Sequence, residues 1–163
     1  METKIEMSLF RAPITNKLPL RTVSLTEVAQ MVKNPWLEPQ TVALRLIQDE
    51  AEARRYKGWN FPYITPAGVF SYCADASMVK PSGVLCMDLD HLDDVDGLKW
   101  FLRVDLARCS HRQWFDAVRN YLMSMYGLGP KQADPSVRNE SRACFLCYDP
   151  EVYVATSLLS NDK

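Results

Sequence analysis

Apolar residues recur at helical spacing in three segments of the chain, which predicts three amphipathic helices. Segment 24–34 opens with Ser24 and Glu27, a pair with the spacing of a capping box, and its apolar repeat stops before a proline. A second, longer helix is expected over about 39–56, where a strongly charged stretch precedes a glycine. A third is expected over 111–126, between a capping serine and a glycine.

Strand patterns lie between and after these helices. Segment 59–73 is rich in aromatic and β-branched residues and is interrupted at 66–68, which predicts short strands joined by a turn. Further strands are expected at 84–89, 97–106 and 142–148. The order helix, helix, strands, helix, strand predicts an α+β fold in which a mostly antiparallel sheet is packed with helices.

The length of 163 residues and the ordinary balance of 47% hydrophobic and 24% charged residues predict one globular domain spanning 1–163. Within it, we expect an N-terminal helical part over about 1–57 and a sheet-containing core over about 58–155. The net charge of −1 argues against a protein that coats DNA non-specifically, although it leaves room for a local basic groove. We expect a cytoplasmic protein that contacts no membrane, because no apolar run approaches about 20 residues and no signal peptide is recognisable.

The odd number of cysteines, five, fits reduced thiols better than a disulfide framework. Cys144 and Cys147 form one C-x-x-C in an apolar context, for which inward-facing strand cysteines are favoured over a zinc site. His91 and His111 complete no recognisable metal spacing.

Two carboxylates lie two residues apart in this region, Asp88 inside the apolar strand expected at 84–89 and Asp90 directly after it. Residues two apart in a strand point to the same face, so both side chains can reach one divalent cation. Magnesium and manganese prefer oxygen ligands, and Mg²⁺ usually needs one or two carboxylates in addition to substrate phosphates. From spacing alone, an equally good alternative is a strand that ends at Asp88 with both aspartates solvated.

Three more residues bear on this possible site. Lys99, in the next strand, can contact phosphate, or it can be an ordinary edge-strand lysine. Asp134 and Arg142, on either side of a polar loop, can act as a third carboxylate and a phosphate clamp. Taken alone, they fit better a turn-forming Asp before a proline and an Arg at a sheet edge.

Basic residues gather at the end of the second expected helix. Arg54, Arg55 and Lys57 can contact nucleic acid, although cations at a helix end also suit the helix dipole. On these residues alone, a solvated helix end is the favoured interpretation.

Taken together, segments 81–94, 96–106, 121–128 and 141–154 resemble the N-terminal domain of bacterial virulence-associated E (VirE-like) proteins of mobile elements. That domain is similar to the catalytic core of the primase-polymerase superfamily. The resemblance implies an RRM-like sheet packed with helices. It also implies bound Mg²⁺ or Mn²⁺, nucleoside triphosphates, a DNA template or primer, and a helicase-like partner.

Matched residue by residue, the resemblance makes Asp88, Asp90 and Asp134 catalytic metal ligands. Lys99 stands where that family has a histidine that contacts the nucleotide phosphates, and Arg142 matches a basic residue after the third carboxylate. The connection from Asp94 to Gly97 is far shorter than in that family, which raises the question of residues missing between Leu92 and Leu98.

The resulting expectation is a primase-polymerase-like nucleotidyltransferase domain that serves replication of a mobile element. The alternative is a catalytically inactive module that binds nucleotide or DNA and acts with a helicase-like partner. The lysine at position 99 favours this alternative, because lysine supplies charge to a phosphate but does not act as an acid or base near neutral pH.

Overall fold

The N-terminal part of the chain combines strands with helices. The computed structural model describes residues 4–92 and 97–156, and it begins with β1 (Glu6–Phe10), β2 (Arg21–Ser24) and α1 (Leu25–Lys33). The capping box that starts α1 is present as predicted. The N-terminal part expected to be helical over about 1–57 therefore also contains two strands. Ile5, Met7 and Leu9 alternate along β1 and its approach, and all three are buried.

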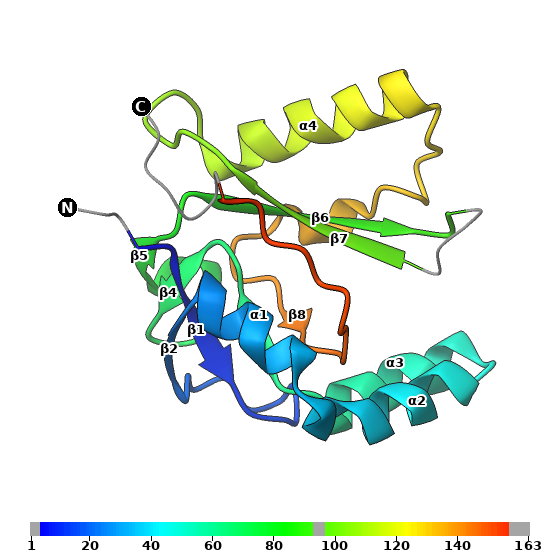
Figure 1. Cartoon of the computed structure of the whole chain (residues 1–163). Coiled ribbons are helices and arrows are strands. Elements are labelled where there is room, and N and C mark those ends of the chain that lie inside the picture. The colour runs from blue at the N-terminus through cyan, green and yellow to red at the C-terminus, as the bar shows by residue number, and fades with distance from the viewer. Residues whose placement is uncertain (1–3, 93–96, 157–163) are drawn as a thin grey trace.

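The helix expected over 39–56 is two helices. After a short 3₁₀ turn, η1 (Pro35–Leu37), the chain forms α2 (Glu38–Leu46), leaves helical geometry, and starts α3 (Glu50–Asn60). Asp49 caps α3 by accepting a hydrogen bond of 2.7 Å from the backbone N–H of Glu52. The resulting helical hairpin projects from the sheets, as Figure 1 shows.

A four-stranded antiparallel sheet in the order β2-β1-β3-β8 forms the base of the molecule. Its other two strands are β3 (Tyr63–Thr65) and β8 (Cys144–Phe145). The last strand is therefore much shorter than the expected 142–148. Beside this sheet lies the pair β4 (Gly68–Phe70) and β5 (Met78–Pro81), with the turn η2 (Asp75–Ser77) between them.

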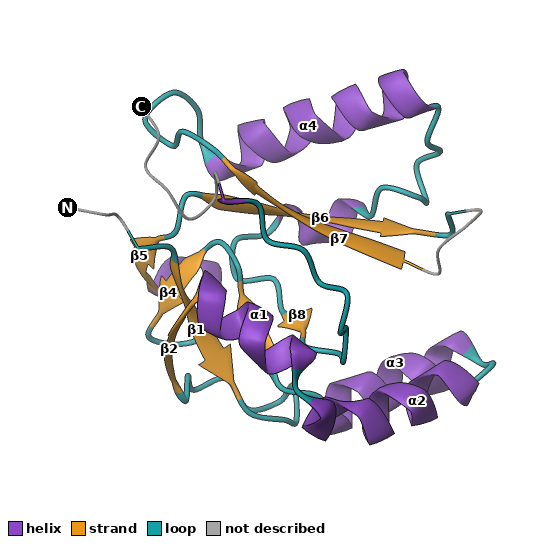
Figure 2. Cartoon of the chain, viewed as in Figure 1, coloured by secondary structure: helices purple, strands orange, loops and turns teal. Residues whose placement is uncertain are grey.

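The long hairpin of β6 (Val84–Asp90) and β7 (Gly97–Arg103) forms a separate layer. Helix α4 (His111–Tyr126) lies along one face of this hairpin, and the four-stranded sheet with α1 lies on the other (Figure 2). Helix α4 starts after the capping Ser110 and ends at Gly127, as the sequence predicted. The structure adds that Ser110 and Gln113 form a capping box and that Gly127 is left-handed. The turn η3 (Pro135–Arg138) follows in the polar loop.

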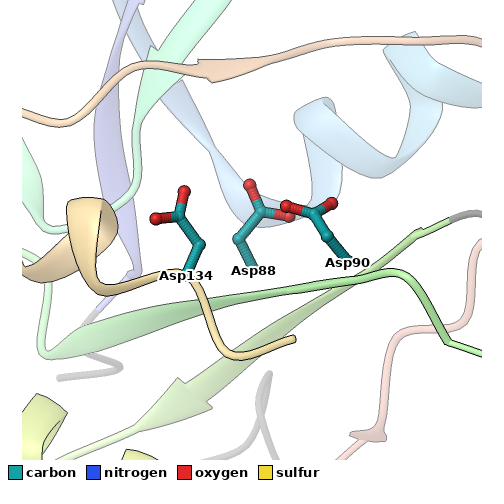
Figure 3. Close-up of side chains that lie close together, drawn as sticks. All are labelled: Asp88, Asp90 and Asp134. Atoms are coloured by element: carbon teal, nitrogen blue, oxygen red, sulfur yellow. The ribbon is translucent and has the colours of Figure 1, made fainter. Parts of the chain in front are cut away.

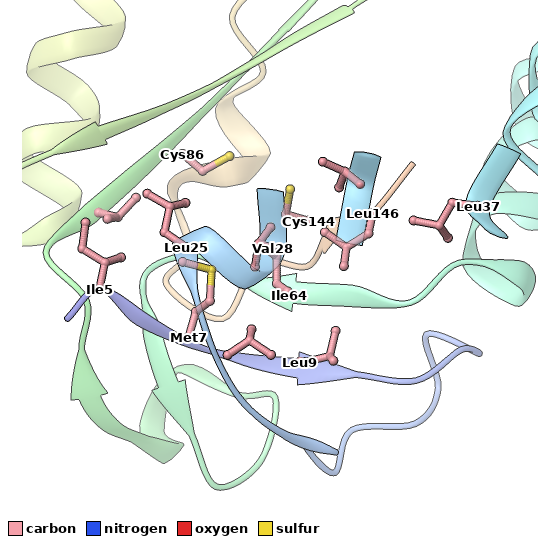
Figure 4. Close-up of a cluster of buried hydrophobic side chains, with 13 residues drawn as sticks. Ile5, Met7, Leu9, Leu25, Val28, Leu37, Ile64, Cys86, Cys144 and Leu146 are labelled. Atoms are coloured by element: carbon pink, nitrogen blue, oxygen red, sulfur yellow. The ribbon is translucent and has the colours of Figure 1, made fainter. Parts of the chain in front are cut away.

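Strand β6 is buried on both faces because it separates two hydrophobic clusters. Leu85, Met87 and Leu89 face α4, where they pack with Phe115 and Leu122. On its other face, β6 contributes to a cluster shared with β1, β2, α1 and β3 (Figure 4). The members of this second cluster are Ile5, Met7, Leu9, Val23, Leu25, Val28, Val32, Leu37, Ile64, Val84, Cys86, Cys144 and Leu146.

The predicted α+β class with antiparallel sheets is confirmed. The described strands are divided among three sheets. The short connection between Asp94 and Gly97 falls on 93–96, which lie outside the described residues. Within the described ranges, none of the helices is both long and apolar enough to cross a membrane.

Candidate metal and nucleotide site

Asp88 and Asp90 extend the even-numbered face of β6 beyond its buried part. Val84 and Cys86 on this face are buried, whereas the two aspartates are partly exposed. Leu89 between them points to the other face and is 3% exposed. The strand therefore buries no unpaired charge: its carboxylates lie where the core ends and solvent begins.

Asp134 is brought beside Asp88 by a short backbone pairing at the free edge of β6. Leu89 pairs antiparallel with Ala133. The N–H of Asp134 donates to the carbonyl oxygen of Asp88 at 3.1 Å, and the N–H of Asp90 donates to the carbonyl oxygen of Gln132 at 2.9 Å. Directly opposite residues in an antiparallel pair share a face. Asp134 therefore points to the same side as Asp88, as Figure 3 shows.

The three carboxylates can each offer an oxygen such that these oxygens lie within 4.8 Å of one another. Two ligands of one Mg²⁺, at about 2.1 Å each, are at most about 4.2 Å apart, so small side-chain adjustments would suffice for all three to bind one ion. The donor set, carboxylate oxygens alone, is of the kind that Mg²⁺ and Mn²⁺ prefer.

Lys99 lies on the other side of Asp88, so that Asp88 stands between a carboxylate and an ammonium. Asp88 and Lys99 are opposite each other in the β6–β7 ladder, and Lys99 Nζ donates to Asp88 Oδ2 at 2.6 Å. Burial lowers the pKa of Lys99, but the nearby sulfur of Cys144 and the carboxylate of Asp88 raise it by more. Lys99 is therefore a permanent cation at the site.

Arg142 approaches the cluster from the loop before β8. Its guanidinium lies 3.9 Å from Asp134 Oδ2, and half of its side chain is exposed. Asp134 also caps η3 by accepting a hydrogen bond of 2.8 Å from the N–H of Ser136. Burial raises the pKa of Asp134, but the Ser136 hydrogen bonds and the charges of Arg142 and Lys99 outweigh it, so the pKa is lowered.

Asp90 is the carboxylate with the least favourable surroundings. Burial raises its pKa and the charge of Asp88 raises it further, against the opposing effect of Lys99. The cluster thus combines two aspartates that have direct cationic or hydrogen-bonding partners with one whose ionised form is disfavoured. A bound cation would relieve this repulsion.

The basic residues predicted for nucleic acid do not all lie together with the cluster. Lys57 stands near the end of α3, its Nζ lies 5.7 Å from the centre of the Phe145 ring, and its charge acts on Asp90. Arg54 and Arg55 are exposed on α3. The structure therefore brings together Asp88, Asp90, Asp134, Lys99 and Arg142, with Lys57 at the margin.

Sequence reasoning missed the supporting groups around these residues. Cys86 and Cys144 pack against each other below Lys99, with a thiol hydrogen bond that raises the pKa of Cys86. The buried His111 lines the same pocket as Asp88. A usable signal for His111 was its position four residues before Phe115 on the apolar face of α4, because a polar ring there calls for a partner.

The loop that carries Arg142 is fastened to the segment between β4 and β5. Asp75 accepts a hydrogen bond of 2.9 Å from the N–H of Ser141 and pairs with Arg112 at 3.2 Å. Cys73 Sγ donates to the carbonyl of Ser141 at 3.3 Å. Arg142 is thus held near the cluster by contacts on the residue before it.

A family model described as the N-terminal domain of BT4734-like proteins matches residues 57–105. The match covers under a third of the chain, from Lys57 to just beyond the end of β7, so it includes Asp88, Asp90 and Lys99 but neither Asp134 nor Arg142. No curated protein and no solved structure gave a significant match.

This match corrects the resemblance on which part of the expectation was based. The segment that carries the Asp-x-Asp strand is similar to the BT4734-like N-terminal domain, and not to a VirE-like or primase-polymerase family. Two aspartates on one face of a strand suit any site that binds a divalent cation, so this short pattern did not separate these families. The roles of the site residues therefore have to be argued from their geometry.

Proposed function

We propose that this domain is a metal-dependent nucleotidyltransferase that binds a nucleoside triphosphate and acts on DNA. The observation that carries the proposal is the convergence of Asp88, Asp90 and Asp134 beside two cations, Lys99 and Arg142. Carboxylates hold Mg²⁺ or Mn²⁺, and neighbouring cations bind phosphate oxygens. A metal–triphosphate complex requires both kinds of group at one place.

Each residue has a definite task in this proposal. A divalent ion held by the three carboxylates would polarise the phosphoryl group and lower the pKa of the attacking hydroxyl. Lys99 would exchange its contact with Asp88 for the incoming phosphate oxygens, and Arg142 can bind them through two N–H groups. Arg54, Arg55 and Lys57 would contact the DNA backbone from α3.

Three narrower expectations are not part of this proposal. A role in replication of a mobile element, with a helicase-like partner, rested on the corrected resemblance and is not retained. An RRM-like sheet and a cytoplasmic location stay predictions. The proposal depends on neither, because it is argued from the side chains around β6.

One observation favours a second candidate, a module that binds nucleotide or DNA without catalysis. Lys99 already neutralises Asp88 at 2.6 Å, so the cluster is partly satisfied by the protein itself. A carboxylate with a permanent internal cation can serve to position a ligand as well as to hold a catalytic metal.

The experiment that tests the proposal is primer extension on a DNA template with Mn²⁺ or Mg²⁺ and labelled nucleotides. Wild-type protein is compared with Asp88→Asn/Asp90→Asn and with Glu38→Gln, a control that removes an exposed carboxylate outside the cluster. We expect the double variant to lose incorporation and the control to keep it. Equal incorporation by all three proteins would refute the proposed mechanism.

Titration calorimetry with Mg²⁺ and a triphosphate separates the two candidates. Binding that is lost in the double variant, without incorporation by the wild type, supports the binding module. Incorporation that depends on both aspartates supports the enzyme. Absence of both triphosphate binding and incorporation in the wild type would exclude both candidates.

A further inference from the structure

A pocket extends from Asp88 along β6 toward Cys86, away from Asp90. The enclosed part of the pocket is small, about 20 Å³, and its mouth is open to solvent. Lys99 and Arg142 line it, whereas Asp90 and Asp134 do not. The residues that line it are Pro66, Ala67, Cys86, Asp88, Lys99, His111, Val137, Asn139, Glu140, Arg142, Ala143 and Cys144. Such a pocket suits a small polar group attached to the phosphates that Lys99 and Arg142 would hold.

His111 contributes an unsatisfied acceptor to this pocket. It is the first residue of α4 and is 6% exposed. Its ring donates a hydrogen bond to the backbone carbonyl of Arg138, but its buried Nδ1 has no hydrogen-bond partner among the described residues. Buried polar side-chain atoms nearly always have a partner, so an orphaned one lining a pocket points to a missing ligand group.

The protonation state of His111 decides which group fits. A ring that donates through its other nitrogen and stays neutral offers a lone pair at Nδ1. Burial lowers the pKa of His111, which keeps the ring neutral near pH 7. The matching group is therefore a donor, such as a hydroxyl, and not a phosphate oxygen.

We propose that this pocket receives a hydroxyl of the nucleotide sugar, which lies at the pocket mouth, and that His111 Nδ1 accepts a hydrogen bond from this hydroxyl. The inference rests on the proposed function, because the triphosphate at Lys99 and Arg142 brings the sugar to the pocket. Asn139 and Glu140 line the same pocket and offer further polar atoms to the sugar edge. The pocket thereby distinguishes nucleotides by their sugar hydroxyls.

The test is titration calorimetry of the whole chain with three Mg²⁺ complexes: ATP, 2′,3′-dideoxy-ATP and tripolyphosphate. Loss of the hydroxyl leaves the buried acceptor unpaired, so we expect dideoxy-ATP to bind about 5- to 50-fold more weakly than ATP. Tripolyphosphate tests the phosphate site separately, because it has no sugar. Equal affinity of wild-type protein for ATP and dideoxy-ATP would overturn the inference.

Two variants of His111 test whether the preference for ATP over dideoxy-ATP depends on Nδ1 of the ring. His111→Asn keeps a polar atom near the Nδ1 position, and His111→Gln keeps one near the other ring nitrogen, which contacts Arg138. We expect His111→Asn to retain the preference for ATP and His111→Gln to lose it. If folded protein of both variants keeps the full preference, His111 is not the acceptor.

The outcomes also separate this inference from the function on which it rests. Tripolyphosphate binding that needs Asp88, together with equal binding of ATP and dideoxy-ATP, keeps the metal–phosphate site and rejects the sugar pocket. Failure of all three ligands to bind rejects both. The comparison of ligands uses wild-type protein, so it decides the question even if a variant at the buried position fails to fold.

Discussion

Lys99 gives the sharpest prediction, because the metal and the nucleotide should respond to its removal in opposite directions. Lys99→Met preserves most of the side chain's length and apolar surface but removes the ammonium that donates to Asp88 Oδ2 at 2.6 Å. A divalent cation that binds Asp88 must displace this ammonium or share the carboxylate with it. Without the ammonium, the cation should bind more tightly, whereas a triphosphate should bind more weakly.

The size of the effect follows from the exposure of the pair. The side chains of Lys99 and Asp88 are 39% and 18% exposed, so solvent screens the interaction in part. We take about 1–2 kcal/mol, between a surface ion pair and a buried hydrogen bond to a charged group. This corresponds to about 5- to 30-fold tighter binding of metal alone. Metal-free Lys99→Met should unfold more easily, because the three carboxylates then repel one another without a neighbouring ammonium.

The assay is a Mn²⁺ titration followed by electron paramagnetic resonance, with chemical unfolding in the presence of a chelator. Lys80→Met is the matched control, since Lys80 forms a 2.8 Å ion pair with Glu6 outside the cluster. We expect the control to lose a little stability and to leave Mn²⁺ affinity unchanged. The reasoning is refuted if Lys99→Met binds Mn²⁺ no more tightly than wild type while remaining folded.

Three further predictions test other parts of the fold and site. Burial and the charge of Asp88 raise the pKa of Asp90, so its ionised form destabilises the fold above its folded pKa and has no such effect below its unfolded pKa. In thermal melts without metal, Asp90→Asn should therefore gain about 0.2–1 kcal/mol of stability at pH 7 and none in acid. The same variant should lose Mn²⁺ binding in a titration. Burial raises the pKa of Asp75, but hydrogen bonds from Ser141 and the charge of Arg112 lower it by more, so ionised Asp75 stabilises the fold at neutral pH and this stability is lost as pH falls through the folded pKa. Asp75→Ala should cost about 1–3 kcal/mol in urea unfolding at pH 7. It should also weaken triphosphate binding but leave Mn²⁺ binding unchanged. Gly68→Ala should cost about 1–3 kcal/mol in the same assay, because a Cβ there meets the backbone carbonyl of Lys80; unchanged stability would contradict the close approach of β4 and β5 at this position.

Local signals in the sequence were sufficient for the ends of α1 and α4 and for the two strands of the central hairpin. The capping box at Ser24 and the capping serine at Ser110 depend on residues close in the sequence, and both form as predicted. The break at 47–49 was missed because the segment keeps good helix formers on both sides of it, and only Asp49 as a cap marks the restart. Strand β1 was missed although its alternating apolar residues carried the signal.

The site was predicted in its parts but not in its assembly. Period-two geometry places Asp88 and Asp90 on one face, and the structure bears this out. The sequence around Asp134 and Arg142 favoured ordinary loop residues, because neighbouring residues contain no signal that this loop pairs with β6. His111 was set aside since it fits no metal spacing, whereas its unpaired nitrogen becomes apparent only with the pocket around it.

What determines the site is the register of one short pairing between distant segments. Because side chains alternate along a strand, a shift of one residue between 132–134 and β6 would turn Asp134 toward α4 and expose Ala133, which is fully buried. Arg119 on α4 holds this register by donating to the carbonyls of Ala133 and Pro130 at 2.9 and 3.1 Å. The third carboxylate is therefore placed by the packing of α4 and by the core on the far face of β6. The residues around position 134 encode neither the packing of α4 nor this core. The sequence therefore identified Asp134 as a candidate ligand but could not predict its position beside Asp88.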